Sequence, residues 1–281
     1  MEKIRSAIAK ARVERDAIEA GQPRQQRPAP REGTTDTPVA PDAVSTHWAA
    51  LPEATFNADL MRRNRIVAYQ RGHESTSIDM MRTRILQQMR DNNWRRLAIT
   101  SPTAACGKST IALNLGVSMQ RQADLRTLLL ELDLRRPSLI RLLGSKPTTA
   151  TFADVLSGKA DFADNGLCYG GNLAVGTSSG RSRDVAELLA SEGVGDVLSR
   201  IEVDYQPNVV IFDMPPMLAA DDMMAFATQV DCVLIVAAAE RTTTKEVDLC
   251  EQELARQTNV MGVVLNECRY MGPEANYGYY G

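Results

Sequence analysis

The central part of the chain alternates short apolar runs with segments in which apolar residues recur at helical spacing. The runs are rich in Val, Ile and Leu. They predict strands at Leu97–Thr100, Thr127–Leu132, Leu173–Val175, Val209–Phe212, Cys232–Val236 and Gly262–Leu265. Strands that are apolar on both faces and are separated by helices form a parallel sheet with helices packed on it. The pattern therefore predicts an α/β fold with a mostly parallel sheet that helices cover on both faces.

Helical spacing of apolar residues predicts helices on either side of these strands. Two of them, 57–70 and 75–91, precede the first strand, and two more, 222–229 and 243–257, lie among the last strands. The second helix carries its apolar residues at positions 78, 81, 85 and 89. We find no internal repeat.

The N-terminal part has a different pattern. Residues 2–20 predict a short amphipathic helix with a few isoleucines on one side and basic residues around them. Such a helix is either solvated or docked to anionic lipid or a partner helix. Residues 21–56 are expected to be a disordered linker, because the stretch up to Ser45 holds five prolines and has Val39 and Val44 as its only large aliphatic residues.

Composition limits the classes of function. A length of 281 residues allows one α/β domain of about 200 residues with appendages. The net charge of −3 argues against nucleic acid as the main partner. Five widely spaced cysteines without a CxxC pair, and two histidines, indicate reduced thiols and no zinc site. The longest strongly apolar stretch, Cys232–Ala239, is far shorter than the roughly 20 residues of a membrane-spanning helix, so we expect a cytoplasmic chain without a signal peptide.

A phosphate-binding loop follows the first predicted strand. Residues 101–110 read SPTAACGKST and match the GxxxxGK[ST] pattern, except that Pro102 stands at the first glycine. Gly107 would let backbone N–H groups approach a phosphate at a helix N-terminus. Lys108 is expected to meet the β- and γ-phosphates of ATP, and the Ser109 hydroxyl to ligate Mg²⁺. The expected nucleotide-binding residues of this loop are Ala104, Ala105, Cys106, Gly107, Lys108, Ser109 and Thr110.

Cys106 allows two interpretations. It is either a small residue that fills the loop or a thiol whose pKa is lowered by the helix N-terminus, which would make it a target for oxidation or alkylation.

Acidic residues follow two other predicted strands. Glu131 and Asp133 are two residues apart at the end of one strand, so an extended chain would turn both toward Mg²⁺ and the γ-phosphate. Asp213 directly follows another strand, which is the usual place of the carboxylate that holds Mg²⁺ in proteins with a phosphate loop. We expect Lys108, Glu131, Asp133 and Asp213 to be catalytic, and Ser109, Asp133 and Asp213 to hold the metal.

The motifs GKST, LLLELDLRRP and VVIFDMPP, with a tyrosine-rich terminus, make residues 75–281 resemble the bacterial tyrosine kinases of capsule and exopolysaccharide systems. The resemblance implies a P-loop ATPase fold of the nitrogenase-iron-protein and positioning-ATPase type. In that family the second strand ends in DxDxR, so Asp133 and Arg135 match, while Glu131 replaces an aspartate. Asp213 matches the Walker B aspartate. Arg135 and Asn266 are implied to bind the nucleotide, with Arg241 near it, and Asp222 stands where the family often has an acid after its PP motif.

The resemblance also implies partners. These are a membrane-embedded polysaccharide co-polymerase that activates the kinase at the inner face of the plasma membrane, a tyrosine phosphatase and further copies of the chain. Family members form rings through an ExxRxxR motif on the helix before the core. This chain has Thr76, Asp79 and Arg82 there, so only the last arginine fits.

Four tyrosines fall in residues 270–281, a segment that is rich in glycine and poor in aliphatic residues. The expected phosphoacceptors are Tyr270, Tyr277, Tyr279 and Tyr280, modified by a neighbouring molecule. The expected division is thus an N-terminal helix (1–20), a linker (21–56), a P-loop kinase domain (57–269) and a flexible tyrosine tail (270–281). A weakly packed terminus without a phosphoacceptor role is the alternative for the tail.

Two other functions fit the same fold. The first is an ATP-switched positioning or partition ATPase. Such proteins usually carry a second lysine five residues before the loop lysine, where this chain has Thr103. The second is a regulator that binds ATP without catalysis and gates a polysaccharide export partner. The motifs of eukaryotic-type kinases, HRD and DFG, are absent from the sequence.

Overall fold

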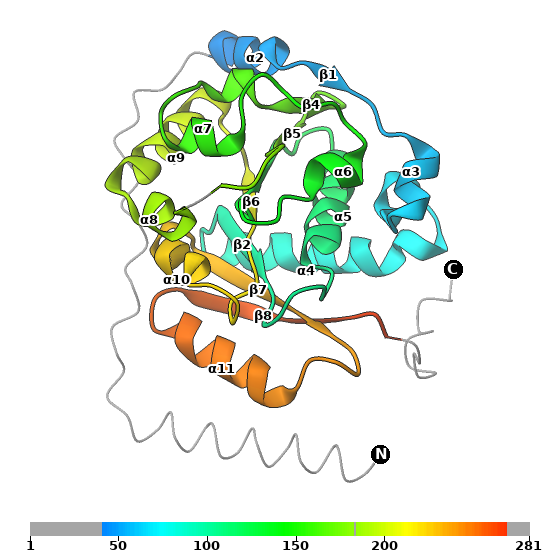
Figure 1. Ribbon diagram of the computed structural model, residues 1–281. Helices are drawn as coiled ribbons and strands as arrows, with labels where there is room; N and C mark the ends of the chain where they lie inside the picture. The colour runs from blue at the N-terminus through cyan, green and yellow to red at the C-terminus, as the bar shows by residue number, and fades with distance from the viewer. Residues whose placement is uncertain (1–40, 183, 269–281) are drawn as a thin grey trace. The chain divides into compact units, whose positions relative to one another are not determined.

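The computed structural model describes residues 41–182 and 184–268, which contain an eight-stranded sheet of order β1-β4-β5-β3-β6-β2-β7-β8 (Figure 1). Neighbouring strands are parallel except for the antiparallel pair β4 and β5. The strands are β1 Glu53–Ala54, β2 Arg96–Thr100, β3 Thr127–Glu131, β4 Leu167–Tyr169, β5 Leu173–Gly176, β6 Val209–Asp213, β7 Cys232–Ala238 and β8 Asn259–Asn266. The predicted α/β fold is confirmed.

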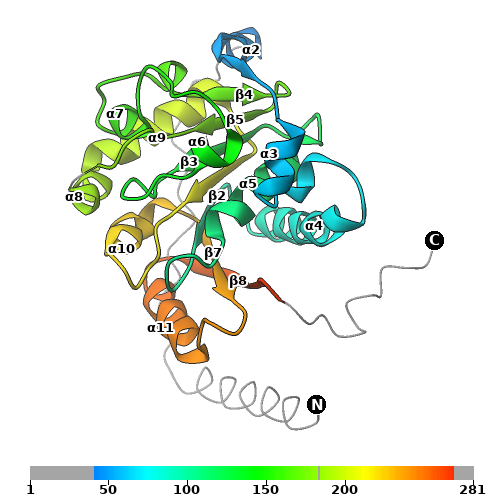
Figure 2. The ribbon, with the colours of Figure 1, turned by 45° about the vertical axis from the view of Figure 1, so that its right-hand side comes forward.

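Helices cover both faces of the sheet (Figures 1 and 2). The α-helices are α2 Pro41–Ala50, α3 Ala58–Arg63, α4 Thr76–Asp91, α5 Lys108–Gln120, α6 Leu139–Leu143, α7 Phe152–Leu156, α8 Val185–Ala190, α9 Glu192–Tyr205, α10 Asp222–Phe226 and α11 Thr244–Ala255. Short 3₁₀ helices are η1 Val67–Tyr69, η2 His73–Ser75, η3 Phe162–Asp164 and η4 Ala227–Gln229. Two apolar cores result, one under α3 to α6 and one under α2 and α7 to α11. None of the described helices has the length and apolar character that crossing a membrane requires.

The order of the central strands positions the site. β6 lies between β2 and β3, with Ile99 beside Asp213 and Glu131 beside Asp213 in the register. Because the three strands are parallel, their carboxyl ends meet at one edge of the sheet, where open α/β sheets bind ligands. The phosphate loop after β2 therefore lies next to the acidic ends of β3 and β6.

The predicted helix 57–70 is wrong as a single helix. Asn57 caps α3 by accepting from the Leu60 N–H, but α3 ends at Arg63 and the chain reverses at Arg65, whose φ is 57°. The reversal places Ile66 in the core beneath α3 to α6. Apolar periodicity continued across the reversal because both sides contact the same core.

The predicted linker 21–56 is wrong for its last part, and its earlier part, like the predicted helix 2–20, lies outside the described residues. Residues 41–50 form α2, which buries Val44 and Trp48, and Leu51 follows them into the core. The indole Nε1 of Trp48 donates to the carbonyl oxygen of Tyr205 at 2.7 Å. The folded domain therefore begins before residue 57.

Trp48→Phe should lower the free energy of unfolding by about 1–3 kcal/mol, because it leaves the Tyr205 carbonyl oxygen buried without its donor. Urea denaturation of the full chain measures this change. Ser45→Ala, at an exposed position of the same helix, is the control. Equal stabilities of the two variants would mean that α2 does not dock through Trp48.

Candidate nucleotide-binding site

The loop from Ser101 to Gly107 connects β2 to α5, and its last residue requires glycine. Gly107 has a φ of 85°, and a Cβ atom there would lie 2.1 Å from the side-chain nitrogen of Asn266. Asn266, the last residue of β8, donates from this nitrogen to the Cys106 carbonyl oxygen at 2.9 Å. The predicted nucleotide residue Asn266 thus contacts the main chain of the loop.

Arg241 holds the loop from the other side. Its Nη2 donates to the Ala105 carbonyl oxygen at 2.7 Å and pairs with Glu267 Oε2 at 2.6 Å. Ala105 has a φ of 62°, which is uncommon for a residue other than glycine. Fixing two loop carbonyls from outside leaves the loop N–H groups free to face an anion.

Cys106 is 2% exposed and lies within the loop. Its sulfur is 3.2 Å from the Thr103 carbonyl oxygen and 3.6 Å from the Thr242 hydroxyl. Burial raises the pKa of the thiol, but hydrogen bonds with Thr103 and Thr242 leave it below its ordinary value. The burial fits a residue that fills the loop, because a reagent reaches the thiol only after the loop opens.

Lys108 begins α5 and points to both acidic strand ends. Its Nζ is 2.6 Å from Asp133 Oδ2, 3.7 Å from Asp213 Oδ1 and 3.3 Å from the Ser109 hydroxyl. Burial lowers the pKa of Lys108, but the Asp213 and Asp133 carboxylates raise it above its ordinary value. The lysine is therefore a fixed positive charge at the edge of the sheet.

Asp213 is fully buried at the end of β6, and neither of its carboxylate oxygens has a hydrogen-bond partner among the described residues. Burial raises the pKa of Asp213 above its ordinary value, with Lys108 opposing. A buried carboxylate whose ion pair with Lys108 spans 3.7 Å and adds no hydrogen bond is costly. A divalent cation nearby would offset that cost.

The residues fit Mg²⁺ shared with a phosphate. Ser109 offers a hydroxyl, and Asp133 and Asp213 offer carboxylates, which are the oxygen ligands that Mg²⁺ prefers. No group of three or more His, Cys, Asp or Glu side chains in the described part of the chain would hold a metal alone. Magnesium sites of nucleotide enzymes need few protein ligands, since phosphate and water supply the rest.

Glu131 departs from the expectation that it faces the metal. Its carboxylate accepts from three backbone N–H groups: those of Ser138 and Leu139 on Oε1 and that of Ser178 on Oε2 at 2.9 Å. Burial raises the pKa of Glu131 to about 7, against the effect of these bonds. In this geometry Glu131 ties together the loops after β3 and β5.

Glu131→Gln should change the pH dependence of stability. Because the pKa of Glu131 is raised by folding, the native state binds the extra proton between about pH 4.5 and 7, and wild-type stability falls as pH rises through that window. Relative to the Gln variant, the free energy of unfolding of wild type should fall by about 1 kcal/mol between pH 6 and pH 8. Denaturation at both pH values tests this, and a difference independent of pH would contradict it.

Arg135 is engaged with Asp222 by a bidentate pair, Nε to Oδ2 at 2.7 Å and Nη2 to Oδ1 at 2.8 Å. Asp222 is fully buried at the start of α10, whereas the Arg135 side chain is 43% exposed. The pair joins the loop after β3 to the loop after β6. Arg135 was predicted to bind the nucleotide and Asp222 to match the family's acid after the PP motif, and the structure pairs the two with each other.

Some contacts of the site were missed in the sequence. The Thr100 hydroxyl donates to the Pro215 carbonyl oxygen at 2.7 Å, and the Met217 N–H donates to the Ser101 carbonyl oxygen at 2.8 Å, which joins the phosphate loop to the loop after β6. Thr242 and Glu267 also contact the site. No motif marks these residues. The predicted phosphoacceptors Tyr270, Tyr277, Tyr279 and Tyr280 lie outside the described residues.

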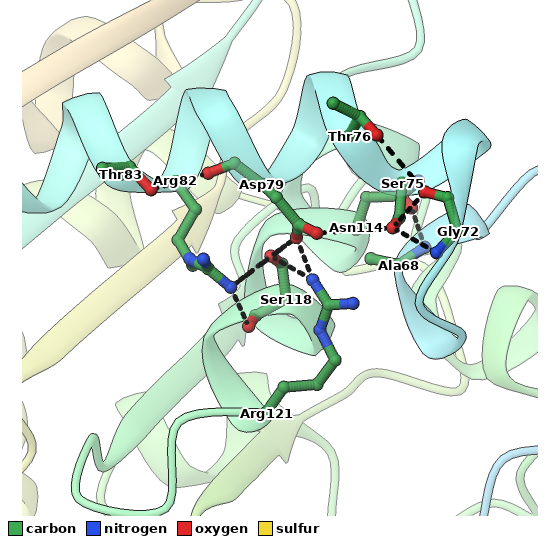
Figure 3. Close-up of polar contacts among 10 residues, drawn as sticks. All are labelled: Ala68, Gly72, Ser75, Thr76, Asp79, Arg82, Thr83, Asn114, Ser118 and Arg121. Carbon is green, nitrogen blue, oxygen red and sulfur yellow. Dashed lines mark hydrogen bonds and ion pairs between the residues drawn. The ribbon is translucent and has the colours of Figure 1, made fainter. Parts of the chain in front are cut away.

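Asp79 and Arg82, at the positions of the assembly motif, face α5 (Figure 3). Asp79 accepts from the Ser118 hydroxyl at 2.6 Å and from Arg121. Arg82 Nη1 donates to the Ser118 carbonyl oxygen at 3.0 Å. Both motif positions are thus engaged within the chain, while Thr76 is exposed and its hydroxyl donates to the Gly72 carbonyl oxygen at 3.3 Å.

Comparison with protein-family models finds no match. The chain is 27% identical over 223 residues to the tyrosine-protein kinase YwqD of Bacillus subtilis, covering 79% of this chain and 92% of YwqD. It is 30% identical over 188 residues to the succinoglycan biosynthesis transport protein ExoP of Rhizobium meliloti, covering 64% of this chain and 23% of ExoP. The kinase domain of the Escherichia coli tyrosine kinase ETK matches with a TM-score of 0.63 and 27% identity, over 70% of this chain and 76% of that one.

Proposed function

The chain belongs to the bacterial tyrosine kinase family, and from this premise we propose that it transfers the γ-phosphoryl group of Mg-ATP to protein tyrosines. The observation that carries the proposal is the position of Lys108. Its ammonium group lies between Asp133 and Asp213 at the start of the helix that follows a phosphate loop. This is the charge arrangement that a transferring phosphoryl group needs.

We assign separate roles to the charged residues. Lys108 stabilises charge on the β- and γ-phosphates, and loop residues 104–110 bind phosphate through backbone N–H groups. Ser109, with Asp133 and Asp213 nearby, would hold Mg²⁺, which would neutralise phosphate charge when bound. Asp133 accepts the proton of the attacking tyrosine hydroxyl, since its carboxylate is slightly exposed while that of Asp213 is fully buried.

Glu131, Arg135, Arg241 and Asn266 have positioning roles in this proposal. Glu131 fixes the loop that carries Asp133 by binding the N–H groups of Ser138 and Leu139. Arg241 and Asn266 fix the phosphate loop through its carbonyls. The replacement of the family's aspartate by Glu131 is consistent with this role, because the longer side chain reaches three backbone donors.

The proposed cellular role is regulation of exopolysaccharide or capsule synthesis at the inner face of the plasma membrane. The support is similarity to ExoP, which is named for succinoglycan biosynthesis and transport and is about four times longer than the matched segment. On this proposal a membrane-embedded co-polymerase activates the kinase, a tyrosine phosphatase reverses its action, and copies of the chain associate.

The test of the activity is incubation of the purified full chain, first treated with phosphatase, with Mg-ATP. Phosphotyrosine is then mapped by mass spectrometry. Phosphate on Tyr270, Tyr277, Tyr279 or Tyr280 is the expected result. ATP hydrolysis without phosphotyrosine would favour the positioning ATPase, and nucleotide binding without either reaction would favour the regulator.

A mixing experiment tests transfer between molecules. A Lys108→Met chain that keeps its tail is mixed with an active chain that ends before Tyr270. Phosphotyrosine on the Lys108→Met chain is expected, because a tail enters a neighbour's site more easily than its own. Labelling of full-length active chain alone, with a blank mixture, would show transfer within one chain.

A further inference from the structure

A second pocket lies far from the phosphate loop. It has a volume of about 440 Å³ and is lined by Arg71, Gln120, Arg121, Gly170, Gly171 and Asn172, together with Ala123. The phosphate loop leads into the N-terminus of α5, and Gln120 is the last residue of that helix. The two sites are therefore separated by the length of α5, about 20 Å. We call it the Arg71–Arg121 pocket.

Positive charge is in excess beside this pocket. Arg71, Arg82 and Arg121 are close enough that repulsion from Arg71, after the larger effect of burial, lowers the pKa of the other two guanidinium groups. Asp79 is the carboxylate that they share: Arg121 binds it directly, and Arg82 Nη1 lies 3.6 Å from its Oδ1. Among the described residues, Arg82 and Arg121 thus share one carboxylate and no ion pair engages Arg71, which leaves positive charge in excess among these three side chains.

The Arg121 guanidinium is only partly satisfied. Its Nη2 meets Asp79 and, at 3.2 Å, the Ser118 hydroxyl, whereas its Nε and Nη1 are buried and have no hydrogen-bond partner in the described part of the chain (Figure 3). Buried donors without acceptors cost free energy and call for an explanation. The oxygens of an anion in the adjoining pocket would accept from a guanidinium that turns slightly toward them.

The carbonyl group of the last residue of α5 is capped, which weakens its repulsion of an anion. Free carbonyls at a helix C-terminus would repel negative charge. Here the Asn172 side-chain nitrogen donates to the carbonyl oxygen of Gln120, the last residue of α5, at 3.0 Å and to those of Gln122 and Leu125 beyond the helix, while the Asn172 side-chain oxygen is buried without a hydrogen-bond partner in the described part of the chain. Gly171 adds room, since a Cβ atom there would have no neighbour within 4 Å.

We propose that the Arg71–Arg121 pocket binds a phosphorylated tyrosine from the C-terminal segment of a second copy of this chain. The inference rests on the proposed function, which supplies the phosphate. A phosphotyrosine carries about −1.5 to −2 charges and three acceptor oxygens, and paired arginines are its usual partners. The pocket volume lies within the range of small-ligand sites, about 300–1,000 Å³.

Chain length permits both the chain's own segment and that of a second copy, but the chain's own segment must extend over the surface, whereas a second copy can approach the pocket directly. β5 and β8 are five strand spacings apart, about 24 Å, and the pocket lies at the amino end of β5 while β8 ends at the opposite edge of the sheet. The direct separation is therefore about 30 Å, and the path over the surface is longer. The 13 residues from Asn266, where β8 ends, to Tyr279 span at most about 43–47 Å when fully extended.

A concave site with two lining arginines also suits one phosphate group better than a membrane surface. Anionic membranes are bound by clusters of about four to eight basic residues that face outward together. Anionic vesicles are nevertheless included in the test.

The test titrates a peptide of residues 271–281, phosphorylated at Tyr277, Tyr279 and Tyr280, into phosphatase-treated full chain by calorimetry. Wild type should bind the phosphopeptide more tightly than the unphosphorylated peptide, both without nucleotide and with a saturating non-hydrolysable Mg-ATP analogue, which blocks the active site without phosphorylating the tails. Arg71→Glu should weaken binding by about 10-fold or more, since an exposed guanidinium at the pocket becomes a carboxylate. Arg90→Glu makes the same charge change at an exposed position of α4 and should bind like wild type.

A second variant examines the buried donors. Arg121→Lys keeps a cation for Asp79 but removes Nε and Nη1, so phosphopeptide affinity should fall while far-UV circular dichroism and thermal midpoint stay close to wild type. Unchanged affinity of Arg71→Glu, displacement of the phosphopeptide by the non-hydrolysable Mg-ATP analogue, or no binding at all would overturn the proposal. Arg71-dependent binding of anionic vesicles without phosphopeptide binding would overturn the phosphotyrosine occupant. The peptide is synthetic, so the result is read independently of whether the chain is a kinase.

Discussion

Replacing Lys108 with methionine should lower tyrosine phosphorylation by about 100- to 1,000-fold while leaving the fold intact. Lys108 is the cation nearest both acidic strand ends, with Nζ 2.6 Å from Asp133 and 3.7 Å from Asp213. Removing one well-placed charge or donor from a site of developing negative charge typically costs about this much. Methionine matches the length of the lysine side chain and fills the same buried volume.

The measurement is the initial rate of phosphotyrosine formation with Mg-ATP, alongside circular dichroism. Lys146→Met is the control, because Lys146 is exposed on the loop after α6. A Lys108→Met chain that keeps its rate would refute the assignment of the site. A chain that loses both its rate and its circular dichroism spectrum would instead assign the ion pair with Asp133 a structural role.

Asp213→Asn should weaken binding of Mg-ATP by about 10- to 100-fold, the usual cost of losing a group that orients a metal. Its effect on the affinity for ATP without Mg²⁺ should be small, or the affinity should rise. Without the cation, the buried Asp213 carboxylate repels the phosphates, and asparagine removes that repulsion. Calorimetric titration in Mg²⁺ and in chelator separates the two effects.

Stability gives an independent reading of Asp213→Asn. Burial raises the pKa of Asp213, so at pH values above the ordinary pKa of an aspartate this side chain destabilises the native state in the absence of Mg²⁺. The Asn variant should therefore unfold at a higher urea concentration than wild type when no Mg²⁺ is present. Asp248→Asn, at an exposed position of α11, should change neither the affinity for Mg-ATP nor the stability in urea. Equal loss of affinity with and without Mg²⁺ would contradict the metal role.

The phosphate loop and the acidic strand ends were predictable because each is a local motif. The Gly107-Lys108 pair needs only a preceding strand and a following helix. Asp133 and Asp213 needed one further step, the rule that carboxyl ends of parallel strands meet. The six predicted strands are confirmed for the same reason, since each carries a strong apolar run.

The hydrogen-bond partners of Glu131 could not be predicted in the same way. Strand alternation predicted which side its carboxylate faces, but the three backbone donors come from positions 138, 139 and 178, which only the folded loops bring together. The Arg135–Asp222 pair, likewise, joins residues 87 positions apart. Tertiary partners of this kind leave no periodic signal in one sequence.

The sequence analysis missed helix α2 because the proline-rich composition of the segment was given more weight than the spacing of its apolar residues. The prolines that precede it predict disorder, although Val44, Trp48 and Leu51 recur at helical intervals. The contact that fixes α2, from Trp48 to Tyr205, spans 157 positions. The strands β1 and β4 were missed because two or three residues are too few to show a period.

Asn266 lies between the phosphate loop and the tyrosine-bearing segment, so nucleotide binding and binding of that segment can be coupled through it. Its side chain is bonded to the phosphate loop, and only two described residues separate it from the tyrosine-bearing segment. If bound nucleotide alters how that segment departs from β8, then capture of the segment by any partner alters nucleotide affinity by the same factor. A protein that binds the tyrosines would thereby change the affinity of the enzyme for ATP without contacting the nucleotide.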